Sequence, residues 1–90
     1  KNNILLCNAV DMSSRGLRVC VDEPIEQYSV LQMGVQLRGM AEPFYMVGEV
    51  RWCAFSTEGR PGYWVGFELL ESAGTDYSTW QELVAQLEHS

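Results

Sequence analysis

The sequence predicts an all-β domain with one terminal helix, arranged as a small antiparallel β-barrel capped by a C-terminal α-helix. Five short segments, most of them with apolar residues at every second position, alternate with turn-forming residues, which is typical of antiparallel strands. The last segment instead spaces its apolar residues as one face of a helix. Ninety residues suffice for one domain with a modest core, so we expect residues 1–90 to form a single domain.

Composition and charge restrict the classes of partner. The chain is 47% hydrophobic and 20% charged, as in ordinary globular domains, and its net charge of -6 argues against binding a nucleic-acid polymer. No apolar run approaches 18 residues, so no membrane insertion is expected. Three unevenly spaced cysteines and a single histidine argue against a zinc site and favour reduced thiols in a cytoplasmic protein.

The first two strands are expected at residues 4–10 and 17–22, joined by a tight turn. Strict alternation in the second strand places its apolar residues on the core face. If Asp11 pairs with Gly16, the core side of the first strand carries Leu6 and Val10, and Cys7 lies opposite Cys20 on the other side.

The middle of the chain is expected to hold a short strand between two turns. Pro24 ends the preceding strand, and residues 25–33 form a weakly patterned connection. A strand then follows Gly34 over residues 35–38, and Pro43 marks the next turn.

A second hairpin is expected from residues 45–55 and 63–70, around a loop rich in glycine and proline. Pairing Phe55 with Gly62 puts Val50 beside Phe67 and Trp52 beside Val65, all on one face. Because a one-residue slip would destroy this match, the pattern predicts the register. Glycines within both strands, Gly48 and Gly66, indicate bulges or bends.

The terminal helix follows a polar break. Ser78 and Thr79 have capping-box spacing to Gln81 and Glu82. The apolar stripe comprises Trp80, Leu83, Val84 and Leu87. Because so short a helix is only marginally stable alone in water, we expect the stripe to dock on the open end of the barrel with Trp80 in the core.

The candidate binding site is the turn at residues 11–16. Asp and Ser side chains fold back onto backbone N–H groups, and Gly16 allows a close approach. The turn therefore displays hydrogen-bond donors and acceptors together on a stiff loop.

Three segments in order resemble the PilZ domain family. Asp11-x-Ser13-x-x-Gly16 is similar to the family's D/NxSxxG signature, and Gly48-Glu49-Val50-Arg51-Trp52 is similar to its Gly-x-Val-x-Trp strand. Val65-Gly66-Phe67-Glu68-Leu69 resembles the next strand, although the family often has Phe where this chain has Leu69.

The resemblance implies a six-stranded barrel that binds the bacterial second messenger cyclic di-GMP and needs no cofactor or metal. It implies that Asp11 and Ser13 hydrogen-bond a guanine and that Gly16 lets the ligand approach, while Arg15 is placed to reach a phosphate. It also implies a module that relays the ligand to a fused domain or a partner protein. Enzymatic activity is not expected, because Ser13 and Ser14 have no neighbouring histidine and no oxyanion or metal constellation appears in the sequence.

The sequence departs from the family in one respect, because it contains no RxxxR segment to hold the phosphates. One explanation is that this segment precedes Lys1, since the chain does not begin with Met and an N-terminal segment is expected to be missing. The alternative is a degenerate PilZ domain that binds no nucleotide and acts as a protein-interaction module.

Overall fold

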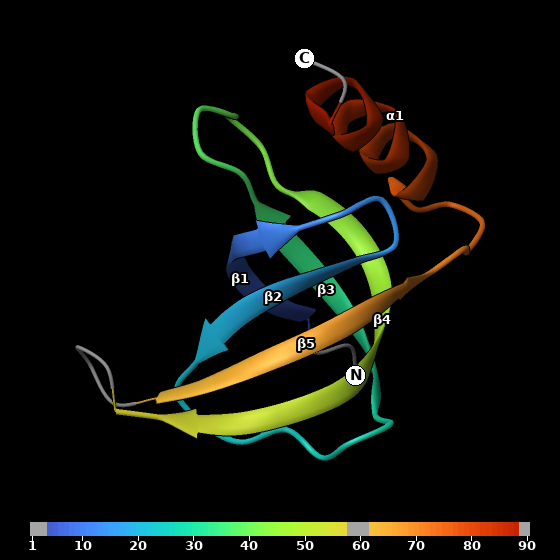
Figure 1. The fold of residues 1–90 in the computed structure, drawn as a ribbon. Helices are drawn as coiled ribbons and strands as arrows, with labels where there is room; N and C mark the ends of the chain where they lie inside the picture. The colour runs from blue at the N-terminus through green and yellow to red at the C-terminus, as the bar shows by residue number, and fades with distance from the viewer. Residues whose placement is uncertain (1–3, 58–61, 89–90) are drawn as a thin grey trace.

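A computed structural model describes residues 4–57 and 62–88 as five strands and one helix (Figure 1). The strands are β1 (Ile4–Met12), β2 (Gly16–Val21), β3 (Val30–Gln36), β4 (Phe44–Ser56) and β5 (Gly62–Leu70), followed by α1 (Tyr77–Glu88). The expected segments are all present. The largest difference is β3, which begins at Val30, within the segment expected to be a connection.

The strands close into a barrel in the order β1-β2-β5-β4-β3. The predicted class is confirmed, but the six strands that the resemblance implied are corrected to five within the described residues. The pairing is not antiparallel throughout either, because β1 and β3 are parallel. Five strands joined by successive reversals cannot alternate around a closed ring, so one neighbouring pair must run in the same direction.

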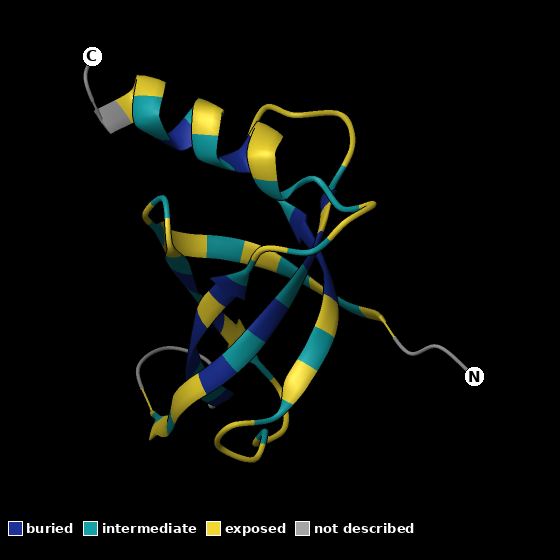
Figure 2. Cartoon of the chain, turned by 90° about the vertical axis from the view of Figure 1, so that its right-hand side faces the viewer, coloured by how far each residue is buried: buried dark blue, intermediate teal, exposed yellow. Residues whose placement is uncertain are grey.

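Alternating side chains of the strands fill the barrel. The side chains of Val19, Met33, Val35, Val50 and Val65 are completely inaccessible to solvent. In Figure 2 the buried positions alternate with exposed ones along the strands and recur on the side of α1 that faces the barrel. The expected alternation of β2 is confirmed, since Leu17 and Val19 are buried and Cys20 is exposed.

The register of the first hairpin differs from the expected one. Met12 lies opposite Leu17 and Asp11 opposite Arg18, so the turn is shorter than predicted and Asp11 belongs to the strand. A bulge lies between Ala9 and Asp11. The bulge adds one residue and so reverses the faces of β1 before Asp11, and Leu6 and Val10, expected in the core, are 70% and 52% exposed.

Cys7 therefore points inward, and the expected pairing with Cys20 is wrong. Its side chain packs against the core, and its thiol lies 3.9 Å from the Gly34 carbonyl oxygen. Desolvation by burial raises the pKa of the Cys7 thiol to about 11, because a thiolate is poorly stabilised there. Cys7 is consequently a protonated core residue at neutral pH, whereas Cys20 is exposed.

The second hairpin contains a bulge close to Gly66, one of the two glycines expected to mark bulges or bends, but the resulting register was not predicted, and Phe55 lies opposite Tyr63 instead of Gly62. Val50 lies opposite Phe67 as expected, but Trp52 lies opposite Gly66 and Cys53 opposite Val65. The ladder shifts between Val50 and Trp52. The extra residue turns Trp52 outward, so the predicted core position of Trp52 is wrong.

Helix α1 covers one end of the barrel (Figures 1 and 2). Trp80 is fully buried, as expected, and packs edge-to-face on Phe44 with 5.5 Å between ring centroids. The helix begins at Tyr77, earlier than the predicted caps at Ser78 and Thr79. This single described helix is neither long nor apolar enough to cross a membrane.

Candidate ligand-binding groove

An open groove of about 340 Å³ lies beside the β1–β2 turn on the outer wall of the barrel. Strands β1, β2, β4 and β5 all contribute to it, and we call it the β1–β2 groove. It is lined by Asp11, Met12, Ser13, Gly16, Leu17, Arg18, Arg51, Trp52, Gly66 and Phe67. Three of the four residues predicted as the site, Asp11, Ser13 and Gly16, are thus brought together.

Ser13 and Gly16 close the turn between the two strands. The Ser13 N–H donates to the Gly16 carbonyl oxygen at 2.8 Å, and the Gly16 N–H donates to the Ser13 hydroxyl oxygen at 3.2 Å. A Cβ on residue 16 would lie 2.6 Å from the Phe67 carbonyl oxygen. Glycine is therefore required here by the close approach of β5, independently of any ligand.

The turn is also held from the C-terminal side of the chain. The Trp80 indole N–H donates to the Ser13 carbonyl oxygen at 3.3 Å, and the Gln81 side-chain amide donates to the Ser14 carbonyl oxygen at 3.2 Å. The Leu69 N–H donates to the Arg15 carbonyl oxygen at 2.8 Å. Helix α1 and β5 together therefore fix the backbone that displays Ser13.

The fourth predicted residue, Arg15, is not brought into the groove. Arg15 is exposed in the turn and is absent from the residues that line the cavity. The Arg15 carbonyl oxygen accepts a hydrogen bond from the Leu69 N–H. Arg15 therefore contributes to the shape of the turn through its backbone.

Arg18 stands beside Asp11 on the wall of the groove. Its guanidinium lies over the Trp64 ring, 4.8 Å from the centroid, and one of its terminal nitrogens is 3.9 Å from an Asp11 carboxylate oxygen. The Nε atom of Arg18 is buried without a hydrogen-bond partner. Stacking on Trp64 orients the guanidinium, while the Asp11 side chain remains 71% exposed and open to a ligand.

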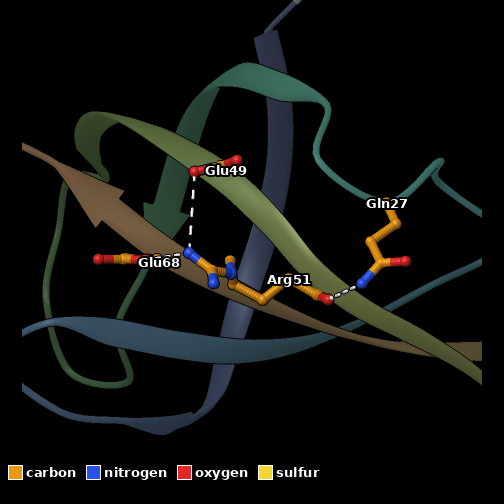
Figure 3. Close-up of polar contacts among 4 residues, drawn as sticks. All are labelled: Gln27, Glu49, Arg51 and Glu68. Carbon is orange, nitrogen blue, oxygen red and sulfur yellow. Dashed lines mark hydrogen bonds and ion pairs between the residues drawn. The ribbon is translucent and has the colours of Figure 1, made fainter.

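The bulge in β4 supplies the opposite wall. It places Arg51 and Trp52, which are consecutive residues, on the outer face of the barrel. The Gln27 side-chain amide donates to the Arg51 carbonyl oxygen at 2.9 Å and so satisfies the bulged backbone (Figure 3). The indole of Trp52 lies across Gly66, where a Cβ would approach its Nε1 to 2.2 Å. Trp52 can lie flat on β5 only because residue 66 is glycine.

Sequence reasoning missed the two arginines and the tryptophan as site residues. Arg18 carried a usable signal, because alternation already placed it on the outer face of β2. Arg51 carried the same signal, because alternation in its strand placed it on the face opposite to Val50. Trp52 carried none, because strict alternation puts Trp52 with Val50 and only the bulge separates them. Asp11, expected in the turn, is an outward-facing strand residue because the ladder continues to Met12, opposite Leu17.

The groove combines hydrogen-bond acceptors, an aromatic surface and positive charge. Asp11 and Ser13 offer oxygen atoms, Trp52 offers a half-exposed ring, and Arg18 and Arg51 carry guanidinium groups in a chain of net charge -6. Such a set suits a ligand with a flat polar ring and an anionic group.

Comparison with known proteins identifies the family of the chain. A search of curated proteins found no match. The family model described as the PilZ domain matches residues 1–86, nearly the whole chain, and includes both the turn and the bulged strand. The chain therefore belongs to the PilZ domain family, whose domains are cyclic di-GMP-binding modules.

Proposed function

We propose that this domain is a receptor for cyclic di-GMP and that the ligand binds in the β1–β2 groove. The observation that carries the proposal is that one groove joins the Asp11–Gly16 motif to Trp52 and two guanidinium groups. Family membership supplies the ligand class, and the side chains supply contacts for each part of it.

Asp11 and Ser13 read a guanine base. A carboxylate can accept hydrogen bonds from the N1–H and N2–H groups of guanine together, which no other common base offers in the same arrangement. Asp11 is exposed enough to do so, and the Ser13 backbone is held in place by Trp80. Preorganisation of this kind reduces the entropy lost on binding.

Arg18, Arg51 and Trp52 hold the remainder of the ligand. Guanidinium groups bind phosphate oxygens through paired N–H donors, and an indole ring provides a surface on which a purine stacks. Arg18 and Arg51 thus offer phosphate contacts within the described residues. An RxxxR segment preceding Lys1 stays a prediction and would add further contacts.

Titration calorimetry with cyclic di-GMP tests this function. We expect Asp11→Ala to weaken binding about tenfold or more, because charge-assisted hydrogen bonds are lost, and Ser13→Ala to weaken it about fivefold. Asp22→Ala is the matched control, since Asp22 is an exposed carboxylate absent from the groove lining.

Removing a negative charge should by itself strengthen the binding of an anionic ligand. Weaker binding by Asp11→Ala, but not by Asp22→Ala, would therefore identify Asp11 as a direct contact. Unchanged or tighter binding by Asp11→Ala, or no heat from the natural chain at high micromolar nucleotide, would refute the proposal. Circular dichroism of each variant verifies that the fold is retained.

The relay to a fused domain or partner protein is the second part of the proposal. Helix α1 touches the motif through Trp80 and Gln81, so a ligand that moves the turn also acts on the helix. We infer that the domain works in the bacterial cytoplasm, where cyclic di-GMP is available to it.

A nucleotide-independent interaction module is the second candidate function. Exposed apolar side chains on the outer barrel face favour it, among them Leu6, Tyr45 and Phe55. The interaction module becomes the favoured function if the folded natural chain gives no heat when titrated with cyclic di-GMP in the same calorimetry.

A further inference from the structure

Arg51 is engaged by two carboxylates. Its Nη1 donates to a Glu68 carboxylate oxygen at 2.5 Å and lies 3.9 Å from a carboxylate oxygen of Glu49 (Figure 3). Arg51 lines the groove, whereas neither glutamate does. The guanidinium therefore belongs to the groove, but its Nη1 is directed to the glutamates.

The two glutamates also face each other across the sheet. Glu49 of β4 lies directly opposite Glu68 of β5 in the ladder. Like charges directly opposite in a sheet repel, and here a single cation, Arg51, sits between them. A ligand phosphate that draws Arg51 away must therefore break the pair with Glu68 and leave the two carboxylates facing each other without it.

We propose that Glu68 sets the affinity of the groove by competing with the ligand for Arg51. The inference rests on the proposed function, because it requires an anionic ligand in the groove. Glu68 is a positioning residue in this scheme: it touches Arg51 and acts on the ligand only through it. Glu49 acts in the same direction more weakly, since its contact is longer.

Glu68 and Arg51 are both accessible enough for the exchange to occur. Their side chains are 47% and 50% exposed, so water replaces the lost partner when the pair opens. Pairs of this kind contribute little net stability. The fold should therefore tolerate the loss of either charge, which makes the competition measurable.

The test is calorimetry with cyclic di-GMP on the natural chain and on Glu68→Gln, which keeps the shape of the side chain and removes its charge. We expect binding about three- to fivefold tighter, corresponding to one exposed ion pair that no longer has to be broken. Glu23→Gln is the matched control, because it removes the same charge from an exposed residue that does not line the groove.

Arg51→Gln and the double variant Arg51→Gln/Glu68→Gln complete a thermodynamic cycle. If Glu68 acts through Arg51, the gain from Glu68→Gln shrinks to that of Glu23→Gln once Arg51 is absent. The four proteins are compared at one ionic strength, because salt screens exposed charges.

Three outcomes would overturn the inference, and they distinguish its failure from that of the proposed function. Equal effects of Glu68→Gln and Glu23→Gln, with the natural chain still binding, would refute the competition and leave the proposed function intact. A full gain from Glu68→Gln in the Arg51→Gln background would do the same. The absence of heat in every variant would refute the proposed function, and the inference with it.

Discussion

Trp80→Ala is expected to destabilise the domain by about 3–5 kcal/mol, the usual cost of truncating a buried large aromatic side chain. Trp80 is completely buried between α1 and the barrel and packs edge-to-face on Phe44. A domain of this size has a free energy of unfolding of only about 5–13 kcal/mol. Thermal unfolding should show a midpoint at least about 12 °C lower.

Trp52→Ala is the matched control for this prediction. It makes the same chemical change at a ring that is 44% exposed in the groove, so it should cost clearly less stability. Equal losses for the two tryptophans would contradict the placement of α1 on the barrel. Trp80→Phe adds a further comparison, because it keeps most of the packing and leaves the Ser13 carbonyl oxygen without its indole donor.

Gly16→Ala is the second substitution with a large expected effect on folding. The added methyl group would lie 2.6 Å from the Phe67 carbonyl oxygen, which belongs to the backbone of β5 and cannot rotate away. We expect a loss of about 1–3 kcal/mol in the free energy of unfolding, measured by chemical denaturation.

Gly66→Ala provides the comparison, because the atoms nearest to its methyl group belong to the Trp52 side chain and not to the backbone. Trp52 lies on the surface and can swing outward, so Gly66→Ala should cost less stability than Gly16→Ala. A Gly16→Ala protein as stable as the natural one would contradict the close approach of β2 and β5. The expected destabilisation also means that lost binding in Gly16→Ala does not by itself demonstrate a ligand contact.

The fold was predictable where the side-chain pattern is undisturbed. In β2 the alternation from Leu17 to Val21 gives the buried face directly, because nothing interrupts the pleat. Trp80 was predictable as a core residue because helical spacing placed it on the apolar stripe. The parallel pairing of β1 with β3 was not, since it follows from barrel closure and not from either strand alone.

The groove was predictable only in part, and its two bulges explain why. Each bulge adds one residue and reverses the faces that strict alternation assigns beyond it. The bulge beside Asp11 therefore hid the inward direction of Cys7, and the bulge at Arg51 hid the outward direction of Trp52. The bulge at Arg51 is hydrogen-bonded by Gln27, a residue 24 positions away in the chain, so the glycine at position 66 indicated a bulge but no local pattern gave its exact place.

The most direct test of the account is to titrate 15N-labelled natural chain with cyclic di-GMP and follow its NMR signals. We predict that the Trp52 indole N–H and the backbone amides of residues 11–18 shift most, because these groups line the groove or adjoin it. The largest shifts around Leu6, Gly34 and Tyr45, on the β1–β3–β4 face, would contradict the account. So would the absence of any shift at high micromolar nucleotide.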